Sequence, residues 1–413
     1  MGYVRSLRCR ECGAEYPPTR ITVCEACFGP LEVAYELDAV REVFTRDALA
    51  RRAPNLWRYR ELLPVYEDAS RVDLQPGYTP LRRADNLARA LDLRDVWVKD
   101  DTVNPTYSFK DRPVAVAIAK AREWGLEAVG CASTGNLAAA TAAAAAKARL
   151  PCYVFAPASL DATKLLLPRL YGATLVPVDG TYDDANRVAL LTADKRGWGF
   201  VNINLRSYYA EGSKTLLFET WEQLGFALPD VIVTPLGSGL LLTAVEKGIR
   251  ELIGLGELTG STTRLVGTQA AGCAPIVRGF ESPDGRPKPV RRPDTIAESL
   301  AIGDPASGTE AIQIMRRSRG FADAPTDSEI LDAQELLAKT EGVFAEPAGG
   351  TTVATLRRAR DDGRIDRDER VVILVTGNGL KAPHVLDGRF PPIVPVAADP
   401  AAVDAFLGGL AHG

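Results

Sequence analysis

The sequence predicts an α/β protein with two lobes, mostly parallel sheets, flanking helices and a small metal-binding ribbon at its N-terminus. From residue 95 onward, short apolar runs alternate with helical patterns, and this alternation is typical of parallel sheets. Two C-x-x-C pairs precede that region and predict the ribbon. The runs that we interpret as strands span residues 95–101, 128–133, 152–156, 174–178, 200–204, 230–235, 264–268 and 369–376.

Four strand–helix units follow one another in the middle of the chain and predict a compact small lobe. The remaining units predict a larger lobe. A charged stretch that contains Trp57 lies between the ribbon and the lobes, and we interpret it as a connector that wraps the main body. The predicted divisions are residues 1–36 for the ribbon, 37–75 for the connector, 76–127 and 205–400 for the large domain, 128–204 for the small domain and 401–413 for a tail.

The composition argues against several classes of protein. The net charge of the 413 residues is only −4, which gives no reason to expect a nucleic-acid or membrane-surface partner. The N-terminus lacks the apolar core of a signal peptide, and no run is long and apolar enough to span a membrane. The odd number of cysteines, seven, speaks against a disulfide framework and for a reducing compartment. We therefore expect a cytoplasmic protein. The two histidines, His384 and His412, are too few for a histidine-rich catalytic metal site.

The N-terminal cysteines have the spacing of a structural zinc site. Cys9 and Cys12 form the first C-x-x-C pair, and Cys24 and Cys27 form the second. Two such turns place four thiolates tetrahedrally around one zinc ion. A closed set of four cysteine ligands leaves no open position for chemistry, so this zinc would be structural. A ribbon with an empty site and a redox pair are the alternatives.

One lysine, Lys110, lies where a turn meets a buried helix. Residues 104–106 are a turn signal, and a helix start with Pro113 in its first turn follows the lysine. The apolar run 114–119 predicts that this helix is buried on most sides. Burial lowers the pKa of a lysine, and a partly neutral lysine is the nucleophile that Schiff-base chemistry requires. The alternative is a lysine whose stem lies on the protein while its amine is in water.

Three polar turns follow predicted strands, at the edge where an open α/β sheet places its binding site. Residues 133–136, Ser-Thr-Gly-Asn, begin an alanine-rich helix whose N-terminus suits a carboxylate, although a plain N-cap is about as good an interpretation. Residues 237–239, Gly-Ser-Gly, expose backbone N–H groups that suit a phosphate, or they form a structural turn. Residues 376–381, Thr-Gly-Asn-Gly-Leu-Lys, end the last strand.

These segments together resemble a known enzyme family. Residues 104–112, N-P-T-Y-S-F-K-D-R, resemble the cofactor-lysine signature of threonine synthases and their relatives, the pyridoxal phosphate (PLP) enzymes of the tryptophan synthase β and threonine dehydratase fold. Residues 77–81, 133–136, 346–350 and 376–381 resemble further segments of that family, so the resemblance covers most of the chain and implies PLP fold type II. Tyr107 and Pro113 occupy positions that are usually glycine, which leaves the exact substrate open.

The resemblance also implies a role for each motif. The implied cofactor-binding residues are Lys110 through a Schiff base, Asn136 at the ring oxygen, Gly237, Ser238 and Gly239 at the phosphate, and Thr376 at the pyridine nitrogen. The implied substrate-binding residues are Ser133, Thr134 and Gly135 at the α-carboxylate, and Asn204 and Arg206 at a substrate phosphate. Lys110 is the implied catalytic residue. For Asn204 and Arg206, a strand-end asparagine and a surface arginine are equally good interpretations.

The implied activity is that of a lyase of threonine biosynthesis, which converts O-phospho-L-homoserine and water into L-threonine and phosphate. The family resemblance further implies a homodimer, and similar zinc ribbons occur on some bacterial and archaeal members. A β-replacement enzyme acting on O-phosphoserine, as cysteate synthase does, and a threonine or serine dehydratase are the nearest alternatives. A ligand-binding protein without turnover is an alternative of a different class.

Overall fold

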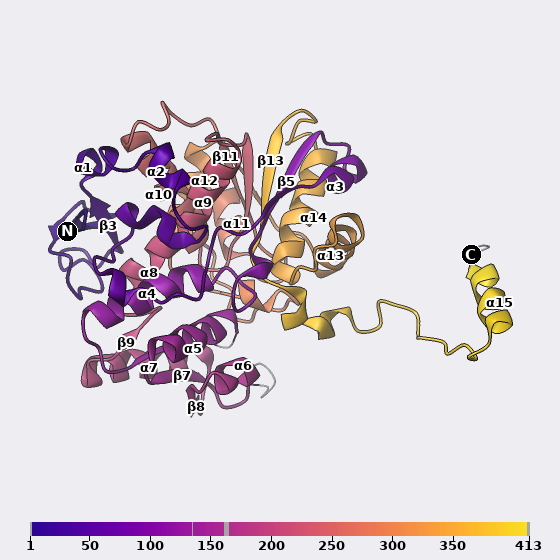
Figure 1. The fold of residues 1–413 in the computed structure, drawn as a ribbon, viewed down its shortest axis with the longest axis horizontal. Helices are drawn as coiled ribbons and strands as arrows, with labels where there is room; N and C mark the ends of the chain where they lie inside the picture. Colours follow the sequence, from indigo (N-terminus) through magenta and orange to yellow (C-terminus); the bar gives the residue numbers. More distant parts are fainter. Residues whose placement is uncertain (1, 134, 161–164, 411–413) are drawn as a thin grey trace. The chain divides into compact units, whose positions relative to one another are not determined.

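The computed structural model describes residues 2–133, 135–160 and 165–410, and it confirms the predicted α/β class. Contacts divide the chain into two compact units, residues 1–381 and residues 382–413. The first unit holds three sheets, which Figure 1 shows with the helices around them. The predicted domain divisions remain predictions.

The largest sheet has six strands in the order β12-β11-β10-β13-β5-β4. Its strands are β4 (Leu81–Arg83), β5 (Asp95–Asp100), β10 (Val231–Pro235), β11 (Arg264–Thr268), β12 (Ala322–Asp323) and β13 (Arg370–Val375). The helices around it are α3 (Asp85–Ala90), α9 (Thr215–Gln223), α10 (Leu240–Gly254), α11 (Pro275–Glu281), α12 (Gly308–Arg317), α13 (Asp327–Glu341) and α14 (Pro347–Asp361).

Helices cover both faces of this sheet, and the strand sequences explain why. On β10, Val231 and Val233 pack in the core that contains α13 and α14, while Ile232 between them packs in the core that contains α9, α10 and α12. Successive side chains of a strand point to opposite faces, so a sheet covered on both faces requires continuous apolar runs. All neighbouring strands run parallel except β4, which is antiparallel to β5 at the sheet edge.

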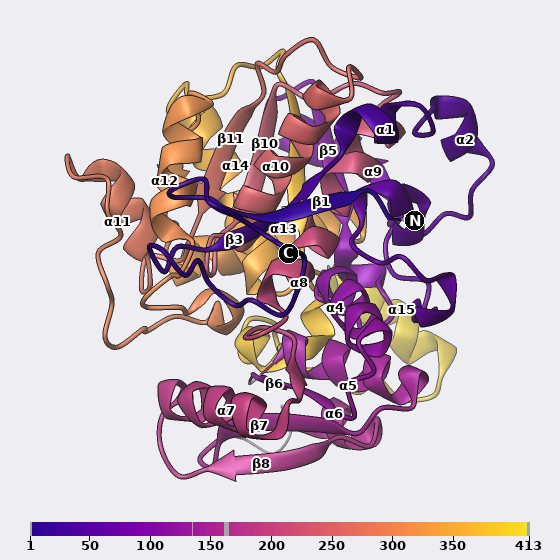
Figure 2. The same cartoon turned by 90° about the vertical axis from the view of Figure 1, so that its left-hand side faces the viewer.

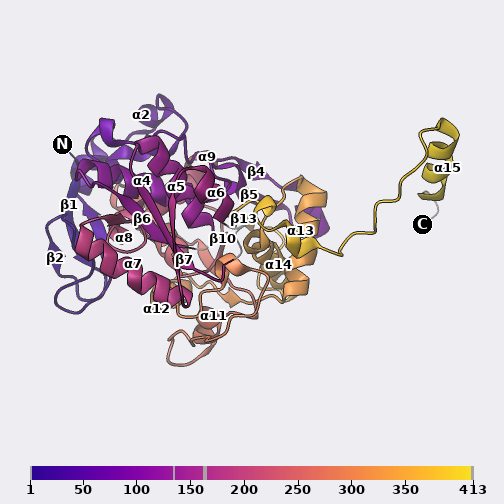
Figure 3. The same cartoon turned by 90° about the horizontal axis from the view of Figure 1, so that it is seen from below.

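The four-stranded sheet is entirely parallel, with the order β8-β7-β6-β9. Its strands are β6 (Val129–Ala132), β7 (Cys152–Pro157), β8 (Thr174–Val178) and β9 (Gly199–Phe200), and its helices are α5 (Asn136–Ala148), α6 (Leu166–Leu170) and α7 (Tyr182–Arg196). Cys131 and Val154 pack against α5, whereas Ala132 and Phe155 pack against α7, so helices again cover both faces (Figure 3). The strand predicted at residues 200–204 is shorter than expected, since β9 ends at Phe200.

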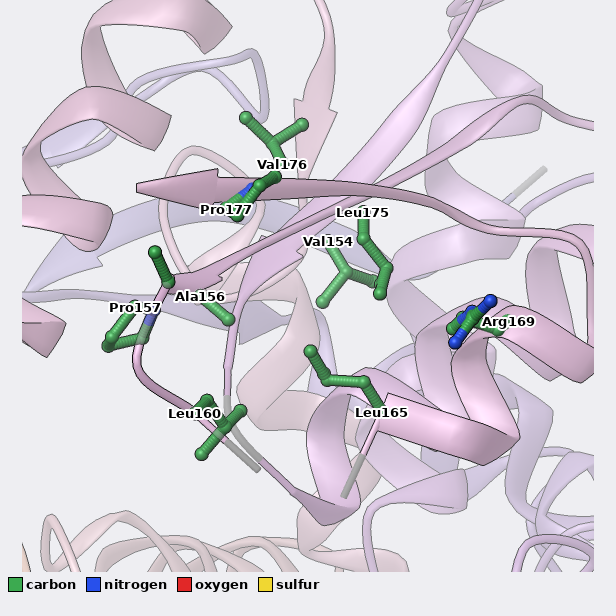
Figure 4. A pocket seen from close by; sticks show the side chains of 10 residues that line it. Val154, Ala156, Pro157, Leu160, Leu165, Arg169, Leu175, Val176 and Pro177 are labelled. Atoms are coloured by element: carbon green, nitrogen blue, oxygen red, sulfur yellow. The ribbon is translucent and has the colours of Figure 1, made fainter. Parts of the chain in front are cut away.

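A small apolar cavity of about 140 Å³ lies between β7, β8 and α6. Figure 4 shows Val154, Leu165 and Leu175 pointing into this space, with Arg169 at its side. Its wall is mostly aliphatic and contains none of the predicted site residues. We therefore interpret it as a packing gap inside the small lobe.

Two helices, α4 (Asp111–Glu123) and α8 (Arg206–Ser213), pack against each other in the interior of the first unit. Every residue of α4 from Asp111 to Ala121 is buried, which confirms the predicted helix start and its burial. Gly212 of α8 faces the backbone of Arg112 and Pro113, where a Cβ would overlap with it. The N-terminal turn of α4, which follows Lys110, is therefore held by close backbone packing.

The N-terminal ribbon is a three-stranded antiparallel sheet with β1 at its centre. Its strands are β1 (Val4–Cys9), β2 (Glu15–Tyr16) and β3 (Leu31–Tyr35). Leu7 and Val33 are buried in the same core as α8, α9 and α10, and Figure 2 shows β1 and β3 beside these helices. Buried polar contacts add to this packing: the Tyr35 hydroxyl donates to Glu211 at 2.8 Å, and Lys247 donates to the Val33 carbonyl at 2.6 Å.

Two short segments complete the description. Residues 37–75 contain the helices α1 (Leu37–Arg41) and α2 (Arg46–Ala50) and the 3-10 turns η1 (Leu56–Leu62) and η2 (Asp68–Ser70). The second unit contains the 3-10 turn η7 (Pro383–Leu386) and the helix α15 (Pro400–Leu410). Among the described residues, no helix has the length and apolar character that a membrane span requires.

Candidate active site

The ends of three neighbouring parallel strands bring the predicted motifs to one edge of the large sheet. The strands β10, β13 and β5 lie side by side in that order. The chain leaves β5 toward Lys110, leaves β13 at residues 376–379, and leaves β10 at residues 237–239. Because the carboxyl ends of parallel strands meet at the same edge, segments far apart in the sequence become neighbours there.

The lysine turn and the segment after β13 are joined by backbone hydrogen bonds. The Phe109 N–H donates to the Thr376 carbonyl at 2.8 Å, and the Asn378 N–H donates to the Tyr107 carbonyl at 3.0 Å. Ser108 and Gly377 form an isolated β-bridge between these two bonds. Lys110 therefore directly follows Phe109, whose backbone is hydrogen-bonded to Thr376 at the end of β13.

Side chains of the lysine motif lock the turn from within. Asp111 accepts hydrogen bonds from the backbone N–H and the hydroxyl of Thr106, both at 2.8 Å. Asn104 accepts one from the Gly77 N–H at 3.0 Å, which attaches the preceding segment of the chain to the same turn. Burial raises the pKa of Asp111 to about 6, and the two bonds from Thr106 oppose that rise. The motif residues around Lys110 are therefore largely structural.

Tyr107 adopts a left-handed backbone conformation with φ of +63°. A residue with a Cβ is sterically strained in this conformation, whereas glycine is not. This geometry explains why the resemblance to the enzyme family implies glycine at this position. The tyrosine side chain is half exposed, at 52%. Since Tyr107 also supplies the carbonyl that binds Asn378, this strained residue lies directly beside the lysine turn.

The Lys110 amine makes no hydrogen bond and no ion pair with any residue that the structure describes. Its nitrogen lies 5.1 Å from the centre of the Phe109 ring. Burial lowers the pKa of Lys110 to about 8, and the carboxylate of Glu346 opposes this shift. About a tenth of an amine with that pKa is neutral at pH 7, which is far more than for an ordinary lysine with a pKa near 10.4. The predicted nucleophile is thus available and partly deprotonated.

Glu346 connects the two lobes at the site, a role that sequence reasoning missed. The Asn136 amide donates to both carboxylate oxygens of Glu346, at 3.1 and 3.0 Å, and Ser299 donates to one of them at 3.5 Å. The Glu346 N–H donates to the Gly377 carbonyl, and a Cβ at Gly377 would overlap with the Glu346 carboxylate. Burial raises the pKa of Glu346. The sequence signals for Glu346 were its position just before Pro347, at the start of α14, and the resemblance of residues 346–350 to a segment of the family.

The predicted substrate-carboxylate turn starts α5. The Ser133 hydroxyl accepts a hydrogen bond from the Gly135 N–H at 3.3 Å, and Ser133 is buried. Apart from its chain neighbours, no described residue has an atom within 4 Å of the Cβ position of Gly135, so this side of the turn is open among the described residues. Thr134 lies outside the described residues. The turn is near the lysine because Asn136, its last residue, reaches Glu346.

The two candidates for binding a substrate phosphate differ in their contacts. Both ends of the Asn204 amide bind backbone nearby, since it accepts from the Phe200 N–H at 2.7 Å and donates to the Trp198 carbonyl at 2.8 Å. These bonds turn the chain after β9 and explain why the predicted strand is short. Arg206 donates to the Ser307 hydroxyl at 3.3 Å and has no ion-pair partner within the described parts of the chain. Burial lowers the pKa of Arg206.

The glycine turn after β10 ends at the N-terminus of α10. Gly239 is the residue before the helix and has φ of +88°. The Ser307 N–H donates to the Ser238 carbonyl at 2.9 Å, so the residue that receives the bond from Arg206 also supports this turn. A 15-residue helix that begins at such a turn offers free N–H groups and a positive dipole end to an anion.

Comparisons with known proteins agree with this arrangement. The model of the pyridoxal-phosphate dependent enzyme family matches residues 72–377. The chain is 39% identical over 381 residues to the threonine synthase of Methanocaldococcus jannaschii, covering 91% of this chain and 93% of the relative. It is 42% identical over 352 residues to that of Mycobacterium tuberculosis, covering 85% and 94%. The chain belongs to the threonine synthase family of pyridoxal-phosphate-dependent enzymes.

Solved structures of other members of the fold confirm the architecture. Threonine deaminase isoform 2 from Solanum lycopersicum matches with a TM-score of 0.64 and 20% identity, covering 75% of this chain and 88% of that one. Diaminopropionate ammonia lyase from Escherichia coli matches with a TM-score of 0.64 and 18% identity, covering 84% and 92%. At sequence identities of 18–20%, the similarity to these structures concerns the fold alone. This similarity confirms the type II architecture that was expected from the sequence.

The residues at the site fit the cofactor of the family. The Ser108 hydroxyl is buried and has no hydrogen-bond partner among the described residues, so it is left available to a bound group. The Thr376 hydroxyl, which makes no hydrogen bond within the described ranges, lies at the same edge of the sheet. At Gly239 a Cβ would come within 2.8 Å of the Ser307 carbonyl oxygen, so the turn requires glycine there. Lys110 supplies the free amine.

The arginine of the lysine motif has a structural role that is separate from the cofactor. Arg112 donates to Asp101 at 2.7 and 2.8 Å and to Glu219, and it also binds Thr79 at 3.0 Å. Lys99 donates to the same Glu219 at 2.8 Å. All four charged side chains are fully buried. This cluster joins the start of α4 to α9 and to the segment before β4, and so fixes the helix that follows Lys110.

The four N-terminal cysteines meet as the spacing predicted. The sulfur atoms of Cys9, Cys12, Cys24 and Cys27 all lie within 4.8 Å of one another. The remaining cysteines, Cys131, Cys152 and Cys273, are buried free thiols. Four such thiolates are one of the ligand sets that bind a tetrahedral structural metal. Arg10, between the first two cysteines, forms an ion pair with Glu310 on α12, which connects this cluster to the helix that begins after Ser307.

Proposed function

We propose that this chain is a threonine synthase, which converts O-phospho-L-homoserine and water into L-threonine and phosphate. The observation that carries the proposal is sequence identity of about 40% to curated threonine synthases over nearly the whole chain. The free, partly neutral amine of Lys110 at the carboxyl edge of the sheet supports it, since the chemistry requires a nucleophilic lysine. The curated relatives with high identity are threonine synthases, whereas the dehydratase-like structures share only the fold, so the threonine synthase activity is favoured over that of a dehydratase.

We assign the cofactor contacts to residues of both lobes. Lys110 would hold the aldehyde carbon, residues 237–239 with the start of α10 would bind the phosphate, and Asn136 would contact the ring oxygen. The hydroxyl of Thr376 would contact the pyridine nitrogen, and a neutral hydroxyl does not keep that nitrogen protonated as a carboxylate does. When bound, the cofactor supplies the electron sink for negative charge that develops on the substrate carbons.

The substrate would be held at both of its anionic ends. The turn of residues 133–135 at the N-terminus of α5 offers N–H groups to the α-carboxylate. Arg206 is the preferred group for the substrate phosphate, because its guanidinium has no ion-pair partner within the described ranges and guanidinium binds phosphate in paired hydrogen bonds. Asn204 has both amide atoms bound to the backbone, so we assign it to the support of the turn that presents Arg206.

Lys110 would carry the proton transfers of the reaction. The amine can take protons from the α and β carbons of the substrate and deliver protons to the γ and α carbons, while the remaining proton of the added water leaves with the phosphate. Phosphate leaves from the γ carbon, and water adds at the β carbon. A pKa near 8 suits this double task, since proton transfer is most efficient when the pKa of the group lies near the working pH.

The proposal is tested by substrate preference. Purified protein with pyridoxal phosphate is supplied with O-phospho-L-homoserine, O-phospho-L-serine, L-threonine and L-serine in parallel, and the release of phosphate and the amino-acid or keto-acid product are measured. We expect threonine and phosphate in equal amounts from O-phospho-L-homoserine alone. Turnover of O-phosphoserine with an added nucleophile would favour the β-replacement alternative, and a keto acid from threonine or serine would favour the dehydratase.

We further propose that the cysteine cluster holds one structural zinc ion. We expect one equivalent of zinc per chain, and its loss from a Cys12→Ser/Cys27→Ser variant, as measured by elemental analysis. Because Leu7 and Val33 of the ribbon are part of the main core, loss of the metal should also lower the thermal unfolding midpoint. A Cys273→Ala variant, which removes a thiol outside the cluster, should keep its zinc. Full zinc content in the double variant, or a disulfide in place of the metal, would contradict the proposal.

We also propose, from the family resemblance, that the protein acts as a cytoplasmic homodimer with the domain divisions predicted from the sequence. Light scattering on the purified protein measures the mass in solution, for which we expect twice the chain mass of 44.4 kDa. A monomeric mass at micromolar concentration would exclude the dimer.

A further inference from the structure

A cavity of about 690 Å³ lies in the connector, and arginines supply much of its wall. None of the residues assigned above to the cofactor, the substrate or the metal lines it. Its volume falls in the range of small-molecule sites, which is roughly 300–1,000 Å³. The charged residues that line it are Arg51, Arg52, Arg58, Arg60, Arg71, Asp68 and Asp73.

Two of the arginines are fixed parts of the wall. Arg52 donates to both carboxylate oxygens of Glu61 at 2.7 Å, and Arg58 donates through Nε to both oxygens of Glu222 at 2.9 and 3.0 Å. These paired bonds are largely buried, since the four side chains are 6–13% exposed. Their charges are therefore already neutralised, and their function is to hold the shape of the wall.

The other three arginines are less well compensated. The side chain of Arg51 has no hydrogen-bond or ion-pair partner in the part of the chain that the structure describes, and it is exposed. Arg60 reaches Glu61 only at 3.3 Å and shares that carboxylate with a wall arginine. Arg71 pairs at 2.6 Å with Asp68, which is 76% exposed and so is largely screened by water. When Asp68 and Asp73 are counted against these three arginines, one positive charge remains in excess in the lining.

Two donors in the wall have no partner among the described residues. They are the indole Nε1 of Trp57 and the guanidinium Nε of Arg71, both buried. The Arg71 guanidinium lies 5.5 Å from the centre of the Trp57 ring. Burial lowers the pKa of Arg71, the attraction to Asp68 opposes this shift, and repulsion from Arg60 adds to it. These two nitrogens are closed off from the cavity, so the groups that face an anion are the guanidinium N–H groups at its surface, where repulsion between Arg60 and Arg71 costs free energy that a bound anion would relieve.

We propose that this cavity binds a small anion that carries phosphate groups. Guanidinium groups bind phosphate oxygens in pairs, and those of Arg51, Arg60 and Arg71 supply the donors. The site would also support the catalytic body, because the wall packs on α4: Trp57 shares a buried cluster with Val116 and Ala119. The end of α4 is tied to the same segment, since Arg122 donates to the carbonyl of Arg71 at 3.3 Å. A bound anion would therefore clamp the connector onto the helix that follows Lys110.

The test is the binding of inorganic pyrophosphate to the full-length protein loaded with pyridoxal phosphate, measured by calorimetry at constant ionic strength. The informative variant is Arg51→Ala/Arg60→Ala, which removes two exposed arginines and leaves the wall pairs intact. The matched control is Arg83→Ala/Arg94→Ala, which removes two exposed arginines elsewhere on the surface. An Arg206→Ala variant separates this cavity from the candidate substrate-phosphate site.

We expect saturable binding of one pyrophosphate by the wild type, the control and Arg206→Ala, and affinity at least about tenfold weaker in Arg51→Ala/Arg60→Ala. Binding should raise the thermal unfolding midpoint of the first three proteins but not of the fourth. Unchanged affinity in Arg51→Ala/Arg60→Ala, loss of binding in Arg206→Ala, or no saturable binding by the wild type would each overturn the proposal. None of these readouts depends on catalytic turnover, so failure here is distinct from failure of the proposed activity.

Discussion

A Lys110→Ala variant should lose more than about 10³-fold in the rate of threonine formation, because one amine is assigned both to cofactor attachment and to proton transfer. The variant should fold, since the Lys110 amine makes no hydrogen bond or ion pair within the described ranges that its removal would break. Borohydride treatment of the wild type should attach the cofactor permanently to the peptide that contains Lys110, as mass spectrometry would detect. The same treatment of the variant should leave every peptide unmodified.

Two controls make the Lys110 result specific. Lys110→Arg keeps a positive charge but offers no amine for condensation, so it should be as inactive as the alanine variant. Lys339→Ala removes a lysine that is 71% exposed on α13, and it should keep wild-type activity. Activity of Lys110→Ala above about a tenth of the wild-type rate would rule out the assigned role.

An Arg112→Ala variant should lower the free energy of unfolding by about 3–5 kcal/mol, which is the cost of breaking a buried ion pair from one side. The substitution leaves the carboxylates of Asp101 and Glu219 buried, with only Lys99 as a cationic partner. Thermal and urea unfolding measure the effect. Arg94→Ala, which removes an exposed pair with Asp368, should cost less than about 1 kcal/mol. Equal effects of the two substitutions would contradict the structural role of the cluster.

The same cluster determines how the stability of the protein changes with pH. The cations around Glu219 lower its pKa to about 2, from an ordinary value of 4.5. A carboxylate with a depressed pKa contributes stability that is present above the ordinary pKa and is lost as the pH falls toward the folded-state value. The difference in stability between the wild type and Arg112→Ala should therefore be constant near pH 7 and should shrink below about pH 4.5.

Much of the site could be predicted from short stretches of sequence. The lysine junction, the glycine turn before α10 and the four cysteines each combine a local pattern with a local geometry. The first two lie at strand ends within the strand–helix alternation, and the cysteines lie in the separate N-terminal ribbon. The length of β9 was not predictable from its apolar residues, because Asn204 binds the backbone at Trp198 and Phe200 and turns the chain early. The strand propensity of residues 200–204 predicts a strand, but the hydrogen bonds of the Asn204 side chain end that strand at Phe200.

By itself, the sequence determined the α/β class, the cluster of four cysteines in the ribbon and the junction that holds Lys110, because hydrophobic period, cysteine spacing and turn residues are properties of neighbours in the chain. Tertiary structure alone decided which polar residues act at the site and which are internal supports. Asn136 meets Glu346 across 210 residues and Arg112 meets Glu219 across 107. Such pairs form only when the sheets assemble. The assembled fold gives Arg112 two buried carboxylate partners, whereas it leaves the Lys110 amine without an ion pair among the described residues.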